Sequence, residues 1–134
     1  MKEEIIALVR QRLKQATDTM KEAEFLLSKE MYRGAINRCY YSMFSATLAL
    51  LAIKQLGSSK HSGVIDLFHR EFVKSGLFPK ATAKLLSKAF ELRCSSDYKE
   101  FVEPNKEQIG KLFESAKTFV EKARGLAEEL LSKG

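Results

Sequence analysis

One stretch of the sequence, residues 38–45, combines side chains that can bind a phosphate or act on it. Within Arg38-Cys-Tyr-Tyr-Ser-Met-Phe-Ser45, an arginine, two tyrosines and a serine interrupt an otherwise apolar segment. At about 100° of rotation per helical residue, Arg38, Tyr41 and Ser45 share one narrow face. Because burying an unpaired guanidinium costs several kcal/mol, we expect Arg38 to reach solvent or a partner, or to belong to a site.

The other polar residues suggest neither a metal centre nor a familiar catalytic motif. His61 can titrate near neutral pH, and Arg93 with Asp97 is most simply an ion pair four residues apart in a helix. Cys39 and Cys94 lack metal-ligand spacing and are interpreted as reduced thiols. Since the sequence also contains no Walker loop, dinucleotide fingerprint or serine-hydrolase elbow, we predict no metal and no cofactor.

The net charge of +6 is unevenly distributed along the chain. There is no acidic residue between Met31 and Ile65, whereas this stretch holds four bases, Arg33, Arg38, Lys54 and Lys60. A local positive field of this kind favours partners that carry phosphate. Many basic proteins bind no nucleic acid, so charge alone leaves a nucleic-acid role open.

The segments that must position these side chains have the apolar periodicity of helices. Apolar residues recur every three or four positions from Ile6 to Leu27 and from Ile109 to Leu130, which predicts two long amphipathic helices. No stretch alternates with a period of two for long enough to form a strand. Three further helices are predicted over residues 31–55, 60–74 and 81–94. We therefore predict an all-α fold, a single domain over residues 1–134 that forms an up-and-down bundle of about five helices.

Several residues are suited to begin or end these helices. Ser59 is a possible cap for the third helix, and Ser75-Gly76 is suited to end it. Asn105 and Gln108 have the spacing of a capping box at the start of the last helix. Gly63 lowers helix stability by about 1 kcal/mol relative to alanine, so we expect it to allow close packing against the second helix.

The sequence favours a cytoplasmic protein that does not associate with a membrane. The longest apolar run, Met43 to Ile53, is about half the length that spans a bilayer. The chain opens with Met1-Lys-Glu-Glu4, and acidic residues at this position are atypical of a signal peptide.

Residues 35–44, with the sequence AINRCYYSMF, resemble the signature helix of the HEPN superfamily, whose members are small helical bundles. The resemblance continues through His61-Ser-Gly-Val64, Phe68, Glu71-Phe-Val73 and Gly76, and then Arg93 followed by Asp97-Tyr98, as in the stand-alone prokaryotic branch. It covers roughly residues 20–125.

This resemblance implies a homodimer that pairs with a minimal nucleotidyltransferase. In such pairs the HEPN protein acts as a toxin, frequently a metal-independent RNase, and the nucleotidyltransferase neutralises it. The RNase motif of the family is an arginine and, after about four to six intervening residues, a histidine. The arginine binds the scissile phosphate and the histidine supplies acid–base chemistry, in a cleft that the two subunits form together.

The sequence departs from this motif at its second residue. Arg38 matches the arginine, but Ser45 stands where the histidine is expected. A serine cannot shuttle protons near neutral pH without an activating base, so the sequence leaves open whether the chain is an enzyme. His61, from the next helix or from the second subunit of a dimer, is a possible substitute.

Three functions follow from these residues. The leading hypothesis is a module that binds RNA or a nucleotide phosphate through Arg38, Tyr41 and Ser45 and works with a nucleotidyltransferase in a toxin–antitoxin-type system. The first alternative is an active metal-independent RNase whose catalytic residues are Arg38, Ser45 and His61. The second is a ligand-free helical scaffold in which Arg38 only pairs with Asp97.

Overall fold

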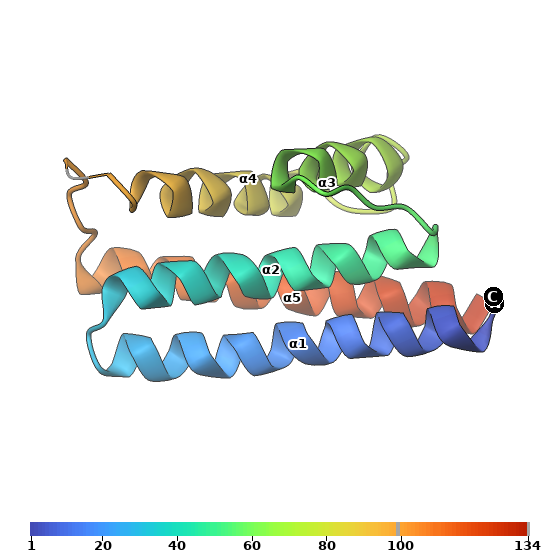
Figure 1. The fold of residues 1–134 in the computed structure, drawn as a ribbon, viewed down its shortest axis with the longest axis horizontal. Helices are drawn as coiled ribbons and strands as arrows, with labels where there is room; N and C mark the ends of the chain where they lie inside the picture. Colours follow the sequence, from blue (N-terminus) through green and yellow to red (C-terminus); the bar gives the residue numbers. More distant parts are fainter. Residues whose placement is uncertain (99, 134) are drawn as a thin grey trace.

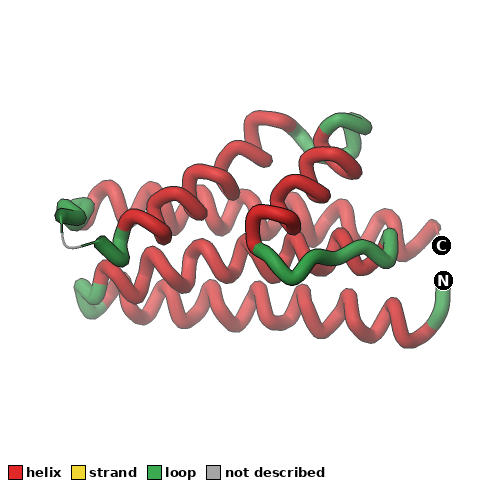
Figure 2. The backbone as a smooth tube through the Cα atoms, turned by 45° about the horizontal axis from the view of Figure 1, so that its top comes forward, coloured by secondary structure: helices red, strands yellow, loops and turns green. Residues whose placement is uncertain are grey.

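The computed structural model describes residues 1–98 and 100–133, which form a helical bundle. Its elements are α1 (Glu3–Ser28), α2 (Tyr32–Ile53), α3 (His61–Phe68), the π-helical turn η1 (His69–Val73), α4 (Lys80–Ser95) and α5 (Lys106–Lys133). Helices α1, α2 and α5 run lengthwise side by side, and α3 and α4 cover one side of this layer (Figure 1, Figure 2). The predicted all-α, up-and-down bundle is confirmed, and the described residues include no strand.

Helix α2 is the centre of the bundle because it packs against all four other α-helices. Twelve of its 22 residues are buried. Many of the buried residues where α1, α2 and α5 meet are alanines, and small side chains allow helix axes to approach closely. These alanines are at most 1% exposed: Ala16, Ala23, Ala35, Ala46, Ala49, Ala116, Ala123 and Ala127.

Helix α2 ends at Ile53, two residues before the predicted end. Gln55 adopts a left-handed conformation with a φ of 57°, as Glu30 does after α1. The backbone N–H of Leu56 donates to the carbonyl oxygen of Leu51 at 3.0 Å. This geometry is typical of a Schellman motif, in which the left-handed position is usually a glycine. Because Gln55 occupies that position here, the sequence did not show where α2 ends.

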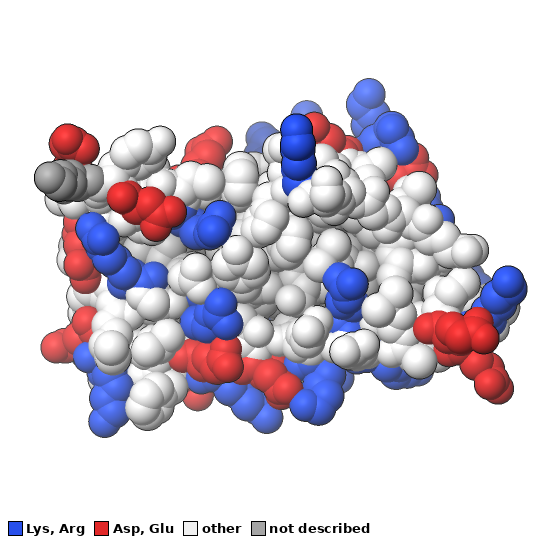
Figure 3. Space-filling model, in the orientation of Figure 1, with Lys and Arg blue, Asp and Glu red and all other residues white. Residues whose placement is uncertain are grey.

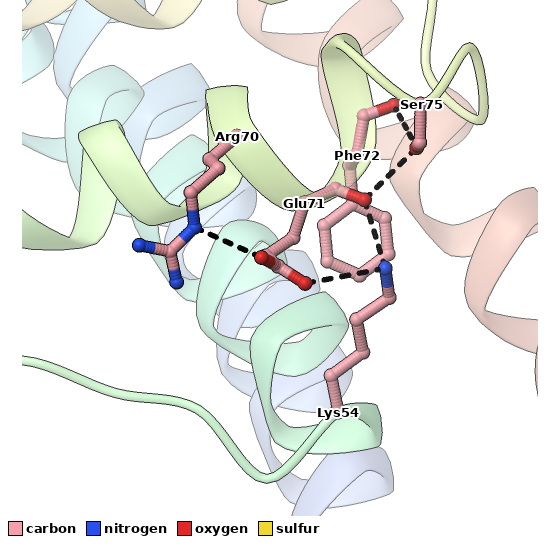
Figure 4. A network of polar contacts seen from close by, with 5 residues as sticks. All are labelled: Lys54, Arg70, Glu71, Phe72 and Ser75. Atoms are coloured by element: carbon pink, nitrogen blue, oxygen red, sulfur yellow. Dashed lines mark hydrogen bonds and ion pairs between the residues drawn. The ribbon is translucent and has the colours of Figure 1, made fainter.

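A π-helical turn follows α3, where the sequence predicted one continuous helix over residues 60–74. The Lys54 ammonium and the Ser75 hydroxyl both donate to the backbone carbonyl of Glu71, at 2.8 and 2.9 Å (Figure 4). Lys54 Nζ also lies 3.6 Å from the Glu71 carboxylate and 4.7 Å from the centroid of the Phe72 ring. These contacts tie the end of α2 to η1.

The predictions for the start of α3 were wrong in two respects. Lys60, not Ser59, precedes the helix, and no side chain caps it. Gly63 permits a close approach to the preceding loop, not to α2, because a Cβ atom at this position would lie 2.2 Å from the hydroxyl of Ser58.

The predicted capping box at the start of α5 is confirmed. The backbone N–H of Asn105 donates to Gln108 Oε1, and the backbone N–H of Gln108 donates to Asn105 Oδ1, both at 2.9 Å. The pair satisfies two backbone donors near the helix start and fixes where α5 begins.

We predict that Asn105→Ala lowers the free energy of unfolding by about 1 kcal/mol, because an N-cap hydrogen bond is lost. Urea denaturation of wild type and variant measures the difference. Gln15→Ala, at an exposed position within α1, serves as the control and should change stability little. Equal stability of Asn105→Ala and wild type would show that the capping box contributes nothing.

Candidate functional site

Arg38 lies on α2 with its guanidinium partly open to solvent. Its Nε and Nη2 donate to Asn37 Oδ1 at 3.0 and 2.7 Å, and its Nη1 donates to Glu22 Oε1 of α1 at 3.1 Å. The Arg38 side chain is 33% exposed and that of Glu22 is 54% exposed. The predicted pairing of Arg38 with Asp97 is wrong, since the acid that Arg38 contacts is Glu22.

Tyr41 brings Arg38 together with a second arginine. The guanidinium carbons of Arg38 and of Arg93, from α4, lie 5.4 and 5.3 Å from the centroid of the Tyr41 ring. Arg93 is also 5.7 Å from the ring centroid of Tyr40. The predicted Arg93–Asp97 ion pair is not formed between these described residues. Two guanidinium groups thus converge on one aromatic ring, which attracts both.

His61, the first residue of α3, lies in the same group of side chains. Its Nδ1 is 2.8 Å from the Tyr40 hydroxyl. Its ring stacks on Phe44 with 4.2 Å between centroids and meets Tyr41 at 5.6 Å, edge to face. We call Arg38, Tyr40, Tyr41, His61 and Arg93 the arginine cluster.

The hydrogen bond between Tyr40 and His61 determines the protonation of the histidine. Tyr40 is fully buried, and burial raises the pKa of its phenol, so the phenol keeps its proton. That buried proton needs an acceptor, which assigns Tyr40 as the donor to Nδ1 and places the imidazole proton on Nε2. Burial, and then the charge of Arg93, lowers the pKa of His61. His61 is therefore neutral at pH 7, with Nε2–H as a donor.

Ser45 lies one helical turn beyond Tyr41 and is partly buried. Its hydroxyl has no hydrogen-bond partner among the described residues and is not a buried orphan, so it remains accessible to solvent. Since no described residue accepts its proton, the local geometry supplies nothing that would activate Ser45 as a nucleophile. Its predicted role as a ligand to phosphate stays a prediction.

Arg93 is the cluster residue whose role the sequence analysis missed. In α4, Leu86, Phe90 and Arg93 are spaced by four and three residues and so share one face. Leu86 is fully buried, and the Phe90 ring lies 5.6 Å from the Tyr40 ring, centroid to centroid. An arginine that continues an apolar stripe was the available signal that Arg93 faces the bundle and not solvent.

Outside the arginine cluster, the described residues include no metal-binding group and no membrane-spanning helix. Among them, no three or more His, Cys, Asp or Glu side chains are grouped so that they could hold a metal ion. No helix in this part of the chain is both long enough and apolar enough to cross a membrane. Cys39 and Cys94 are free thiols, and burial raises the pKa of Cys39 to about 12, which keeps it protonated and unreactive.

An all-α bundle with an arginine and adjacent tyrosines on its central helix fits the family that the sequence resembles. The HEPN domain matches residues 9–126 of the chain. The chain therefore belongs to the HEPN family.

Named relatives cover almost the whole chain. A UPF0332 protein of Thermotoga maritima is 40% identical over 129 residues, which are 96% of each chain. A Methanocaldococcus jannaschii protein named "Putative toxin MJ0605" is 31% identical over 131 residues, 98% of this chain and 94% of that protein. A second protein of that organism, "Putative toxin MJ0142", is 31% identical over 112 residues, 84% of this chain and 76% of that protein.

We predict that mild acid destabilises the fold through His61. Because its pKa is lower in the folded chain than in the unfolded chain, where it is about 6.5, the unfolded chain takes up the proton first. The stability contributed by neutral His61 is complete above that value and is lost as the pH falls through the folded pKa. The free energy of unfolding should decrease between about pH 7 and pH 5, as urea titrations can measure.

In His61→Gln, the part of the decrease in unfolding free energy that His61 causes should be absent. His69→Gln changes a histidine outside the arginine cluster and should retain that decrease. The carboxylates whose pKa is lowered, Asp18 and Glu71, act in a more acidic range and do not interfere. Identical pH profiles for wild type and His61→Gln would contradict the assignment.

Proposed function

We propose that this HEPN-family chain binds RNA, or the phosphate of a nucleotide, at the arginine cluster. The observation that carries the proposal is the convergence of Arg38 and Arg93 on the ring of Tyr41. Guanidinium groups form paired, charge-assisted hydrogen bonds to phosphate oxygens. A phosphate that contacts both arginines and the Nε2–H of His61 would accept hydrogen bonds from three side chains.

The ion pair that Arg38 forms does not block this proposal. The face of the molecule in Figure 3 carries a broad uncharged area, with both basic and acidic side chains around it. Glu22 is the acid paired with Arg38, and more than half of its side chain is exposed. An exposed pair of this kind contributes about 0–1 kcal/mol, so an incoming phosphate can displace the carboxylate at small cost.

The cellular role that we propose is that of a toxin-like protein in a toxin–antitoxin-type system. Two relatives that are 31% identical to this chain carry the word toxin in their names. Within this proposal the protein forms a homodimer, works in the cytoplasm and is neutralised by a minimal nucleotidyltransferase. The homodimer and the nucleotidyltransferase partner are what the resemblance to the HEPN family implies.

We predict that Arg38→Ala and Arg93→Ala each weaken binding of a short single-stranded RNA by about tenfold or more, because a charge-assisted hydrogen bond is lost. Fluorescence anisotropy at fixed low salt measures the affinity. The matched control is Arg10→Ala, which removes an exposed arginine paired with Glu128 on another part of the surface. Losses of the same size in all three variants would indicate a general charge effect and contradict a specific site.

Glu22→Gln should raise the affinity for the same RNA. The substitution keeps the shape of the side chain and frees the Arg38 guanidinium from its carboxylate partner. Circular dichroism confirms that the variant is folded, and the same titration measures its affinity. Unchanged or weaker binding would show that Arg38 does not contact the RNA.

The position of His61 supports metal-independent RNA cleavage as a second candidate function. His61 lies beside Tyr41 and within the electrostatic influence of Arg93. A histidine that is not part of the family motif therefore lies in the arginine cluster. A neutral imidazole whose Nδ1 accepts from Tyr40 is a donor at Nε2, and its one basic nitrogen, Nδ1, is already occupied. This arrangement therefore favours phosphate binding over acid–base catalysis.

RNA incubated with the protein in EDTA separates the two functions. If the RNase function is correct, wild type cleaves the RNA and both Arg38→Ala and His61→Ala do not. Ser45→His restores the spacing of the family motif and should increase cleavage if the rest of the site is intact. Binding without any cleavage by wild type would leave phosphate binding as the function.

A further inference from the structure

A cavity beside the arginine cluster is not used by the proposed function. Its volume is about 490 Å³, within the range typical of small-molecule sites. It lies between the first half of α1, the second half of α2 and the loop over residues 54–60. This loop runs back along α2 to the start of α3 (Figure 2). Most of the wall is apolar and includes Ile5, Leu8, Leu48 and Ala52.

The charges at this cavity are of one sign. Its lining includes two charged side chains, Arg12 and Lys60, and no carboxylate. Neither cation forms an ion pair with a described residue. Arg12 is partly buried, and a guanidinium in apolar surroundings is costly without an anionic partner. The cavity therefore suits a ligand with an apolar body and a nearby negative charge.

Two aromatic rings connect this cavity to the arginine cluster. Phe44 and His61 line the cavity, and their rings stack with an interplanar angle of 16°. His61 in turn meets Tyr41, the residue on which both cluster arginines converge. His61 thus belongs both to the arginine cluster and to the wall of the cavity.

We propose that the cavity is a nucleobase subsite. It takes the base of a nucleotide whose phosphate lies on the arginine cluster, and Arg12 and Lys60 contact a flanking phosphate. This inference rests on the proposed function and narrows its ligand to single-stranded RNA. In an RNA duplex the bases are stacked and paired, whereas unstacked bases of single strands enter aromatic-lined sites.

The test compares two probes, a short single-stranded RNA and an oligomer of equal length with the same sugar–phosphate backbone but no bases. Ala52→Leu fills the cavity from α2 with a side chain that cannot stack on a base. Gly57→Leu adds a side chain to the loop wall of the cavity, where an added Cβ meets no atom within 4 Å, so the fold should tolerate it. Ala81→Leu, at an exposed position of α4 outside the cavity, is the matched control.

We expect both cavity-filling variants to bind the RNA about tenfold more weakly, since base stacking is lost, and to bind the abasic oligomer as wild type does. The control should bind both probes normally. If the filled variants bind the RNA as wild type does while Arg38→Ala does not, the cavity is not a base subsite although the arginine cluster still binds phosphate. If wild type binds neither probe, both proposals are wrong.

Discussion

The hydroxyl of Tyr40 is fully buried at the centre of the bundle, and the arrangement of the site depends on how it is satisfied. Its side-chain partner is His61, and an unpaired hydroxyl at this depth would cost about 1–3 kcal/mol. The hydrogen bond therefore holds the first residue of α3 against α2. It also leaves Nε2–H of His61 as a donor and places the ring between the arginine cluster and the cavity.

The arginine cluster concentrates positive charge where packing alone would not require it. Arg38 and Arg93 come from different helices and share the ring of Tyr41, and Arg93 has no acidic partner among the described residues. Unusual charge environments of this kind are frequent at functional sites. A phosphate bound by both arginines would add interactions that the unfolded chain lacks, so binding would stabilise the fold.

The sequence predicted the features that depend on local spacing. Helical periodicity located the long helices, and the Asn105–Gln108 spacing identified a real capping box. The sequence did not predict contacts between helices, because these arise only when the bundle assembles. Two examples are the pairing of Arg38 with Glu22 on α1 and the approach of Arg93 to Tyr41. The π-helical turn was not predicted for a similar reason, because Lys54, which contacts Glu71, lies at the end of another helix.

A double-mutant cycle of RNA binding with Arg38→Ala, Arg93→Ala and the double variant tests the central claim most directly. If both arginines contact one phosphate, the two losses are coupled, so the double variant should lose clearly less affinity than the product of the single losses predicts. Losses that multiply would show that the arginines act at separate places, and no loss in any variant would show that the arginine cluster does not bind phosphate.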